Sequence, residues 1–460
     1  MCHDHFFAKS GIAAATKHPV RLAIERHKSR LQSEFTRARL KRKCGSVEAL
    51  IAQLDKENSK KDRRHPRWVR LNTLVAADVA DVLHSLSAAK EVNSLEEVLQ
   101  DENKDLVYTT DKNVPNLYAF PSGSNLTRSI AYDKGQIILQ DKASCFPAWL
   151  LLGGQHDDVI GDVIDGCAAP GNKTSHVAAL LKELQLQGRV FACEKDGQRS
   201  KTLKTMTLKA KADRVEVLAN QDFLALDPDD PRFSNVTHLL LDPSCSGSGI
   251  LNRQDIPKLA LPVDPRASNV DVTAVAIASS KKRKRMPDTV TERTPVPEIT
   301  DEETPEKATF ERLEKLSNLQ TRIVEHAMKF PAAKRITYST CSIHEQENEV
   351  VVSRLLNSEV AQTQGWEVLP RKDQVQGMRM WKHRGVNEAG IQDNTLDENQ
   401  LDACIRCHPD DEEATMGFFV CAFTRDTSTP SLSLTNGHPK QSYTAHETNH
   451  DSDDEWNGFD

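Results

Sequence analysis

Short apolar runs and helical periodicities alternate along the chain from about residue 158. The apolar runs have the length of strands and read "GDVIDG", "RVFACE", "RVEVLAN", "THLLLD" and "KRITYST". Before the last of them, "ERLEKLSNLQTRIVEHAMKF" forms a helical pattern with one apolar face, made of Leu313, Leu316, Leu319 and Ile323. This alternation is typical of a parallel, doubly wound α/β sheet. The segments "GWEVLP" and "GFFVCAFTR" are expected to close the sheet as a strand pair.

The pattern differs on either side of this domain. Short β-rich stretches such as "RWVRLNTLV" mix with helical ones such as "SLEEVLQ", which favours a small α+β module. Near the N-terminus, apolar residues recur at helical spacing among charges, and Ser46 is the expected cap of a further helix. We therefore predict a basic helical region at 1–65, an α+β module at 66–150, an α/β domain at 151–424 with a disordered insertion at 252–308, and a disordered acidic tail at 425–460.

Charge is segregated along the chain, although the net charge is only −7. Residues 21–44 hold nine Lys/Arg and two acids, whereas residues 426–460 hold one Lys and seven acids. A basic stretch of this density is either a solvated helix face or a surface for nucleic acid. The pentapeptide "KKRKR" at 281–285 is either a solvated charge run or, as its place in the predicted insertion favours, a nuclear import signal.

Composition and cysteine usage exclude several classes of protein. No apolar run approaches the ~20 residues of a transmembrane helix, and the first residues lack the apolar core of a signal peptide, so no membrane association is expected. The 10 cysteines are spread thinly and are expected to be mostly reduced. "CIRCH" at 404–408 matches the haem-attachment pattern, but covalent haem attachment requires an exported chain, and no second ligand pair for zinc is nearby. No metal site is predicted.

A glycine loop at 165–176, "DGCAAPGNKTSH", follows a predicted strand and opens a predicted helix. Its small residues Ala168, Ala169 and Gly171 allow a ligand to approach the backbone, and the helix N-terminus offers unpaired N–H groups. The spacings GxxxxGK[ST] and GxGxxG are both absent, which disfavours nucleotide phosphates and dinucleotides.

Acidic residues at the ends of three successive strands favour another ligand. Glu194 ends the second strand, where a carboxylate in this type of sheet bonds the hydroxyls of a ribose. Asp222 follows the third strand and Asp242 ends the fourth. Each acid alone could simply cap a turn, but three at one edge line a single crevice. An adenosine ligand that carries a cation instead of phosphates fits this set, so we predict S-adenosylmethionine as the cofactor.

Two cysteines follow strands on the ligand side of the sheet. Cys245 lies in "DPSCSGSG", and Cys341 lies in "YSTCSIHEQ" before a predicted helix whose N-terminus favours an anion. An ordinary thiol has a pKa near 8.5, so a reactive one needs surroundings that favour the thiolate. The alternative for each is a buried structural cysteine, as expected for Cys193 inside its strand. The position of both thiols at strand ends favours a catalytic role.

Three motifs in this order, "DGCAAPGNKTSH", "LLLDPSCSGSG" and "TYSTCSIHEQENEVV", resemble the Sun family of RNA 5-methylcytosine methyltransferases. The resemblance covers residues 66–424 apart from the insertion. It implies a doubly wound, Rossmann-like methyltransferase domain that uses S-adenosylmethionine, preceded by an RNA-binding α+β module. "HPRWVRLNTL", "LQDKASCFPAWLL" and "IRCHPDDEEATMGFFVCAFTR", with the basic N-terminal helix, are similar to the branch that methylates large-subunit ribosomal RNA. Members of that branch usually carry more helical sequence before "HDHFFAKSG", so a chain that is short at its N-terminus is expected.

The resemblance also implies roles for residues of the site. Cys341, in the "TCS" motif, would attack C6 of cytosine, and Cys245, in the "PSC" motif, would help to release the methylated base. Asp242 would bond the N3/N4 edge of the ring and stabilise the developing charge, with Lys173 assisting. A thiolate is needed because C5 of cytosine is too weak a nucleophile until C6 has been attacked, and the base must leave its stack to reach Cys341.

The cofactor would, by the same resemblance, contact the glycine loop and the strand ends. The residues concerned are Cys167, Ala168, Ala169, Pro170, Gly171, Asn172, Lys173, Glu194, Arg199, Asp222 and Asp242. The loop reads "GNK" where many relatives have "GGK", which is a mild change because asparagine tolerates left-handed backbone angles. The expected partner is large-subunit ribosomal RNA, free or in pre-ribosomal particles. A monomer located in the nucleus, in particular the nucleolus, is expected.

Two other functions are compatible with these motifs. Transfer RNA is the substrate in other Sun branches, although the basic helix and "IRCHPDD" favour ribosomal RNA. A ribosome-assembly factor that binds RNA without catalysis is the second alternative. Such a factor would have no reason to keep Cys341, Cys245, Asp242 and Lys173 together, so we expect an active enzyme.

Overall fold

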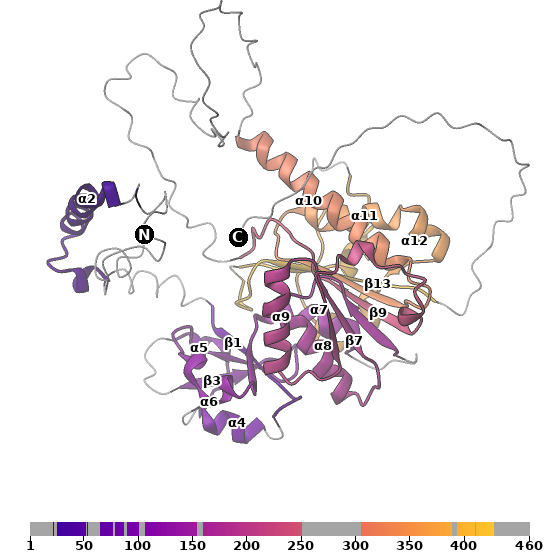
Figure 1. Ribbon diagram of the computed structural model, residues 1–460, viewed down its shortest axis with the longest axis horizontal. Helices are drawn as coiled ribbons and strands as arrows, with labels where there is room; N and C mark the ends of the chain where they lie inside the picture. The colour runs from indigo at the N-terminus through magenta and orange to yellow at the C-terminus, as the bar shows by residue number, and fades with distance from the viewer. Residues whose placement is uncertain are drawn as a thin grey trace, which may run out of the picture.

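The computed structural model describes residues 22, 25–51, 53, 65–76, 79–86, 90–100, 106–153, 160–250, 305–388, 393–409 and 411–426. These residues form a five-stranded sheet and an eight-stranded sheet with helices packed around them (Figure 1). The "KKRKR" segment and all but the first two residues of the predicted tail lie outside the described residues. No helix in the described ranges is both long and apolar enough to cross a bilayer.

The smaller sheet belongs to the predicted α+β module. Its strand order is β2-β3-β4-β1-β5, and all neighbours are antiparallel except β2 and β3. Tyr118 and Phe120 pack inside the module, whereas Leu117 and Ala119 on the same strand pack toward the larger domain, since successive side chains of a strand point to opposite faces. The elements are β1 (Arg67–Leu71), α4 (Val79–Ser85), β2 (Lys90–Glu91), α5 (Leu95–Leu99), β3 (Val107–Thr110), β4 (Leu117–Phe120), α6 (Ile130–Asp133) and β5 (Ile137–Leu139).

The larger sheet confirms the predicted doubly wound fold. Its order is β11-β13-β10-β9-β6-β7-β8, with β12 paired to β13. Strands β6 to β10 are parallel, and β13 joins them antiparallel to β10 and β11, as expected for the closing pair. The strands are β6 (Asp162–Asp165), β7 (Val190–Glu194), β8 (Val215–Ala219), β9 (Val236–Leu241), β10 (Arg335–Thr340), β11 (Glu367–Val368), β12 (Ile405–Cys407) and β13 (Phe418–Thr424).

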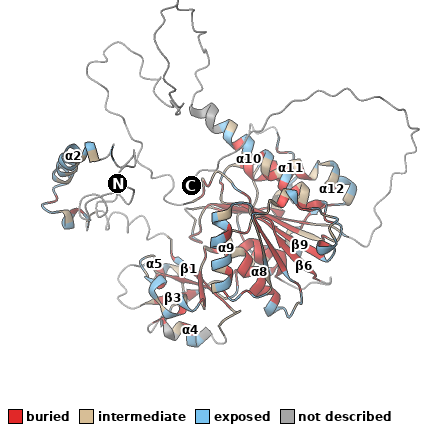
Figure 2. Cartoon of the chain, viewed as in Figure 1, coloured by how far each residue is buried: buried red, intermediate tan, exposed pale blue. Residues whose placement is uncertain are grey.

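Helices cover both faces of the larger sheet, so its central strands are buried on both sides (Figure 2). One face packs against α10, α11 and α12, and the other against α7 and α8. The helices are α7 (Lys142–Leu152), α8 (Asn172–Glu183), α9 (Gly197–Lys209), α10 (Pro305–Met328), α11 (Glu349–Leu356), α12 (Glu359–Gln364), α13 (Gln376–Arg379) and α14 (Glu398–Ala403).

The module and the larger domain share a hydrophobic core. Trp68 and Leu117 of the module pack in one cluster with Phe146 of α7 and with Trp381 and Phe418 of the larger domain. Helix α7 spans residue 150, so the boundary predicted there falls inside a helix that packs on the larger sheet. The reason is that α7 is apolar nearly all round and is buried by both partners.

Three smaller segments singled out in the sequence can be compared with the structure. The "CIRCH" segment forms β12, and its two thiols pack in different core clusters, Cys404 with α11 and Cys407 with the module. Helix α10 begins at Pro305, so the last residues of the predicted insertion at 252–308 are helical. Ser46 caps a helical turn as predicted, because its hydroxyl accepts a hydrogen bond from the Ala49 N–H.

The basic N-terminal region contains α2 (Lys28–Lys41), which has no buried residue. Figure 1 shows α2 apart from both sheets. Its apolar residue Leu40 is 59% exposed, so the apolar spacing of this helix does not serve the core of the described domains.

Candidate active site

The carboxyl ends of β9 and β10 bring the two predicted thiols together. These strands are parallel neighbours, with Tyr338 opposite Leu241, so the segments that follow them leave the sheet side by side. Cys245 Sγ and Cys341 Sγ lie 3.1 Å apart, and both cysteines are free and partly buried. The Gly249 N–H donates to the Cys341 carbonyl at 2.9 Å, which ties the two segments together.

The two thiols have opposite protonation preferences. A hydrogen bond joins the two sulfurs, and either thiol can be its donor; this bond lowers the pKa of Cys341. Desolvation and Asp242 oppose the shift, whereas the ammonium of Lys173 favours it. The same hydrogen bond, followed by desolvation, raises the pKa of Cys245. The directions of these two pKa shifts favour the thiolate at Cys341 and the protonated thiol at Cys245.

This asymmetry predicts the order of alkylation. At neutral pH, iodoacetamide is expected to modify Cys341 before Cys245, because only the thiolate reacts and the pKa of Cys341 is the lower one. Removing the donor in Cys245→Ala should move the reaction of Cys341 to higher pH, whereas Cys245→Ser keeps an O–H donor and should shift it less. Mass spectrometry of the two peptides across a pH series measures this. Equal rates at both thiols would contradict the assignment.

Asp242 and Lys173 form an ion pair beside the thiols. Lys173 Nζ lies 2.8 Å from Asp242 Oδ2 and also donates to Ser144 Oγ at 2.9 Å. The hydroxyl of Ser339 donates to Asp242 Oδ1 at 2.7 Å. Although burial lowers it, the pKa of Lys173 is raised overall because Asp242 stabilises the ammonium. The ring of Phe418 lies 5.4 Å from Nζ and completes the enclosure of the cation.

A buried carboxylate positions the Cys245 loop. Glu347, fully buried behind the site, accepts hydrogen bonds from the Ser246 N–H at 2.9 Å and from Gln320 Nε2 at 3.0 Å. Gln320 Nε2 also donates to the Ser244 carbonyl at 3.0 Å. These bonds hold the backbone on both sides of Cys245, so the thiol has a fixed place relative to Cys341.

The glycine loop has the shape that a cofactor requires. Gly171 has φ of 112° and precedes α8 without a side-chain cap, which leaves the first N–H groups of α8 for a ligand. Asp165, at the end of β6, fixes the loop because its carboxylate accepts a hydrogen bond from Thr174 Oγ1 at 2.7 Å. Burial raises the pKa of Asp165 to about 7. The left-handed angle lies at Gly171, whereas Asn172 is helical, so our reason for tolerating "GNK" was wrong; Asn172 instead donates to the Leu139 carbonyl at 3.3 Å.

Glu194 at the end of β7 and Asp222 after β8 lie at the same edge of the sheet as the glycine loop. Glu194 is 5% exposed, accepts from the Asp196 N–H at 2.8 Å, and lies 3.6 Å from the guanidinium of Arg199. Arg199 also donates to the Ala169 carbonyl at 3.0 Å, so it links β7 to the glycine loop. Asp222 accepts from the Leu224 N–H and pairs with exposed Lys195. The carboxylates of Glu194 and Asp222 at this edge fit the ribose hydroxyls and the positive charge of an adenosine ligand such as S-adenosylmethionine.

Sequence reasoning missed the residues that support this site. Ser144 and Ser339 hold Lys173 and Asp242, and Glu347 holds the Cys245 loop. Ser339 and Glu347 lie within the motif "TYSTCSIHEQENEVV", and Ser144 lies in "LQDKASCFPAWLL". Their polar neighbours in sequence gave no signal that set these three residues apart. Among the described residues, no group of three or more His, Cys, Asp or Glu is arranged to hold a metal ion.

Comparisons with known proteins identify the family. The family model described as "16S rRNA methyltransferase RsmB/F" matches residues 149–264, and the one described as "NOL1/NOP2/Sun domain family member 5, ferredoxin-like domain" matches residues 65–140. The "25S rRNA (cytosine-C(5))-methyltransferase rcm1" of Schizosaccharomyces pombe is 35% identical over 420 residues, which cover 91% of this chain and 75% of that protein. The chain belongs to the Sun family of RNA 5-methylcytosine methyltransferases. The resemblance seen in the sequence is thereby confirmed.

Further relatives agree with this membership of the Sun family. The "28S rRNA (cytosine-C(5))-methyltransferase" of Mus musculus is 34% identical over 416 residues, which cover 89% of this chain and 72% of that protein. The crystal structure of a "Methyltransferase Homolog Protein" from Pyrococcus horikoshii has a TM-score of 0.50 and 20% identity, covering 79% of this chain and 88% of that one. At this identity the likeness supports the fold.

Proposed function

We propose that this protein transfers a methyl group from S-adenosylmethionine to C5 of a cytosine in large-subunit ribosomal RNA. The observation that carries the proposal is the pair of thiols, 3.1 Å apart, beside the ion pair of Lys173 and Asp242. Membership of the Sun family and two relatives named for large-subunit rRNA support the substrate. The same arrangement argues against an inactive assembly factor, because binding RNA alone requires neither thiol.

Each residue of the site has a task in this reaction. The Cys341 thiolate adds to C6, and the electron pair of the C5=C6 bond becomes available at C5. Asp242, held by Lys173, bonds the N3/N4 edge and stabilises the charge that develops on the ring. S-Adenosylmethionine, when bound, supplies the electrophilic methyl group. The C5 proton then passes to water, its electron pair restores the C5=C6 bond, and the C6–S bond breaks with Cys341 leaving as thiolate. Cys245 assists by donating a hydrogen bond from its thiol to the leaving sulfur, 3.1 Å away.

The cofactor would lie against residues 167–173, Glu194, Arg199, Asp222 and Asp242. We expect Glu194→Ala to weaken S-adenosylmethionine binding by at least tenfold, because each lost bond to a ribose hydroxyl contributes ~1.5 to 3 kcal/mol when a charged group takes part. Isothermal calorimetry measures the affinity. Glu216→Ala, at an exposed position of the neighbouring strand β8, is the matched control. Unchanged affinity in a folded Glu194→Ala protein would place the cofactor elsewhere.

Bisulfite sequencing of ribosomal and transfer RNA from a deletion strain tests the substrate. We expect one or more cytosines of large-subunit rRNA to lose their protection from bisulfite conversion in the deletion strain. Restoring the gene should restore this protection, whereas supplying the Cys341→Ala variant should not. Loss confined to transfer RNA would favour the alternative substrate. If every methylated cytosine stayed protected from bisulfite conversion in the deletion strain, the proposed activity would be contradicted.

Nuclear, and in particular nucleolar, residence is proposed from the rRNA substrate and from "KKRKR" at 281–285. Imaging of a fluorescent fusion without residues 281–285 tests it. A nuclear signal that persists would assign import to another segment.

A further inference from the structure

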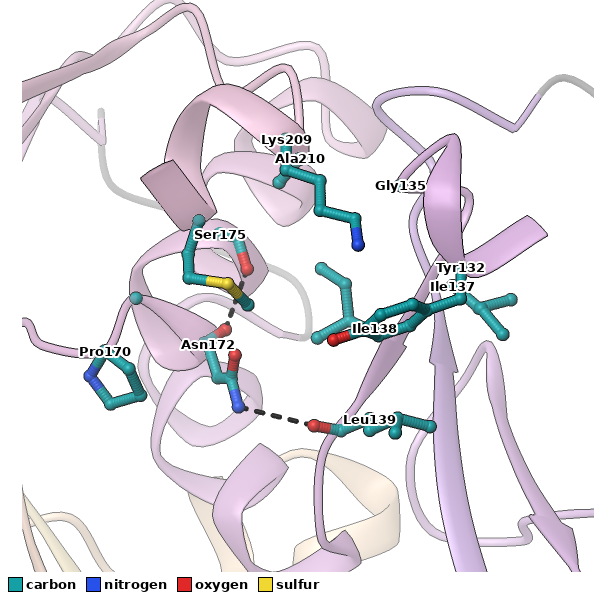
Figure 3. Close-up of a pocket in the computed structure, with 12 residues that line it drawn as sticks. Tyr132, Gly135, Ile137, Ile138, Leu139, Pro170, Asn172, Ser175, Lys209 and Ala210 are labelled. Atoms are coloured by element: carbon teal, nitrogen blue, oxygen red, sulfur yellow. Dashed lines mark hydrogen bonds between the residues drawn. The ribbon is translucent and has the colours of Figure 1, made fainter. Parts of the chain in front are cut away.

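A cavity of about 220 Å³ lies between the module and the larger domain (Figure 3). One wall is formed by α6 and β5 of the module, and the other by the start of α8 and the end of α9. Neither thiol lines it, nor do Glu194, Asp222 and Asp242. The cavity therefore lies beside the reacting groups and not among them, although it shares Pro170, Gly171 and Asn172 with the glycine loop that the cofactor would contact.

The lining of the cavity suits a flat, uncharged ring. Tyr132 turns its ring into the space, facing Asn172, with apolar Ile138 and Met206 also in the wall (Figure 3). Lys209 Nζ lies 3.6 Å from the centroid of the Tyr132 ring. An apolar cavity of ~150 Å³ accommodates a benzene ring, so this larger one has room for a nucleobase. Aromatic side chains with a neighbouring cation are the usual platform for bases of single-stranded nucleic acid.

Positive charge leads from the catalytic edge to this cavity along α9. The helix holds four cations and no acid, and Arg199 at its start contacts the glycine loop while Lys209 at its end lines the cavity. Between them Lys201 and Lys204 are exposed and form no ion pair with a described residue. A helix of this length spans about 20 Å, which is several nucleotides of a strand. Figure 2 shows the outer side of α9 as exposed surface.

We propose that the substrate RNA crosses α9 as a single strand and places one base, close in sequence to the target cytosine, in the cavity against Tyr132. This inference rests on the proposed function and names the conformation of its substrate. A strand is favoured over a duplex because a paired base cannot enter a cavity, and phosphates complement the cations of α9. The ring of Tyr132 and the apolar side chains of Ile138 and Met206 suit a base, and the cations of α9 outside the cavity suit the phosphates.

The first test maps the contact directly. Wild-type protein without cofactor is irradiated with single-stranded 20-nucleotide RNAs that together cover the large-subunit rRNA, each carrying 4-thiouridine at one position. We expect one position to crosslink to the peptides that contain Tyr132 or Met206, and annealing a complementary strand to abolish that crosslink. Crosslinks found only on other surfaces would overturn the proposal. Because crosslinking needs no turnover, its outcome is independent of whether methylation is observed.

The second test uses variants and kinetics. Tyr132→Ala is expected to raise KM for the RNA about tenfold and to leave the Kd for S-adenosylmethionine unchanged, and Tyr132→Phe is expected to restore KM because it keeps the ring. Lys201→Gln with Lys204→Gln should reduce the slope of log affinity against log salt by about 1.4, since each phosphate of a single strand contributes about 0.7. Exposed Lys329→Gln with Lys372→Gln is the control. An unaltered KM together with an unaltered slope would overturn the proposal.

Discussion

Cys341→Ala is expected to yield neither methylated RNA nor a covalent adduct, whereas Cys245→Ala is expected to accumulate a protein–RNA complex that survives denaturation. The order of bond making explains the difference. Without the Cys341 thiolate, C6 is never attacked and C5 stays unreactive. Without Cys245, attack and methyl transfer still occur, but the step that breaks the C6–S bond is impaired.

Denaturing gels of both variants with radiolabelled RNA measure these outcomes. Cys245→Ser is the matched control, because its hydroxyl still donates to Cys341 and keeps the pKa of that thiol lowered while removing the second sulfur. We expect it to form the adduct faster than Cys245→Ala. The rival assignment, in which Cys245 attacks, reverses the pattern, so an adduct from Cys341→Ala and none from Cys245→Ala would refute our reading.

Lys142→Met is expected to lower the free energy of unfolding by about 3 to 5 kcal/mol, the range found when one partner of a buried ion pair is removed. The Lys142 side chain is 1% exposed, and its Nζ lies 2.6 Å from Asp111 and 2.9 Å from Glu413. Asn113 accepts a third bond at 2.9 Å, and the rings of Trp68 and Trp381 lie 5.4 and 5.1 Å away. Removing the ammonium leaves the buried carboxylate of Asp111 without a cation, whereas Glu413 keeps its ion pair with Lys112 at 2.7 Å.

Urea unfolding followed by tryptophan fluorescence measures the loss. Lys382→Met is the control, since Lys382 also pairs with a glutamate, Glu412, but both side chains are exposed and such pairs contribute little. We expect its unfolding midpoint to stay close to that of the wild type. A Lys142→Met protein as stable as this control would show that the buried network is dispensable.

The sequence was most informative where a residue's place follows from its own strand. Cys245, Cys341 and Asp242 come directly after buried strands, so their meeting at one edge could be predicted from parallel topology alone. The segments "GWEVLP" and "GFFVCAFTR" were also predicted as a strand pair, and they form β11 and β13, which pair antiparallel. β12 was missed because three residues are too short for a periodicity.

What the sequence did not predict depends on contacts between distant segments. Ser144 reaches Lys173 only because α7 packs beside α8, and the cavity at Tyr132 exists only because the module docks on the larger domain. The left-handed backbone angle lies at Gly171 and not at Asn172. The Asn172 side chain instead bonds to the Leu139 carbonyl of β5, a contact between distant segments. The local pattern of apolar and polar residues does not show which distant segments pack together.

Helix α7 has two polar residues near its start with different partners. Lys142 is bonded to Asp111 and Asn113 of the module, and Ser144, two residues later, accepts a bond from Lys173. The module and the reacting groups are thus attached to the same helical turn, which leaves little freedom between them. An RNA held by the module would therefore present its bases at a set distance from Cys341. We expect such an enzyme to select a cytosine by its position along the bound RNA, so moving the target by one nucleotide should reduce methylation more than changing its neighbours.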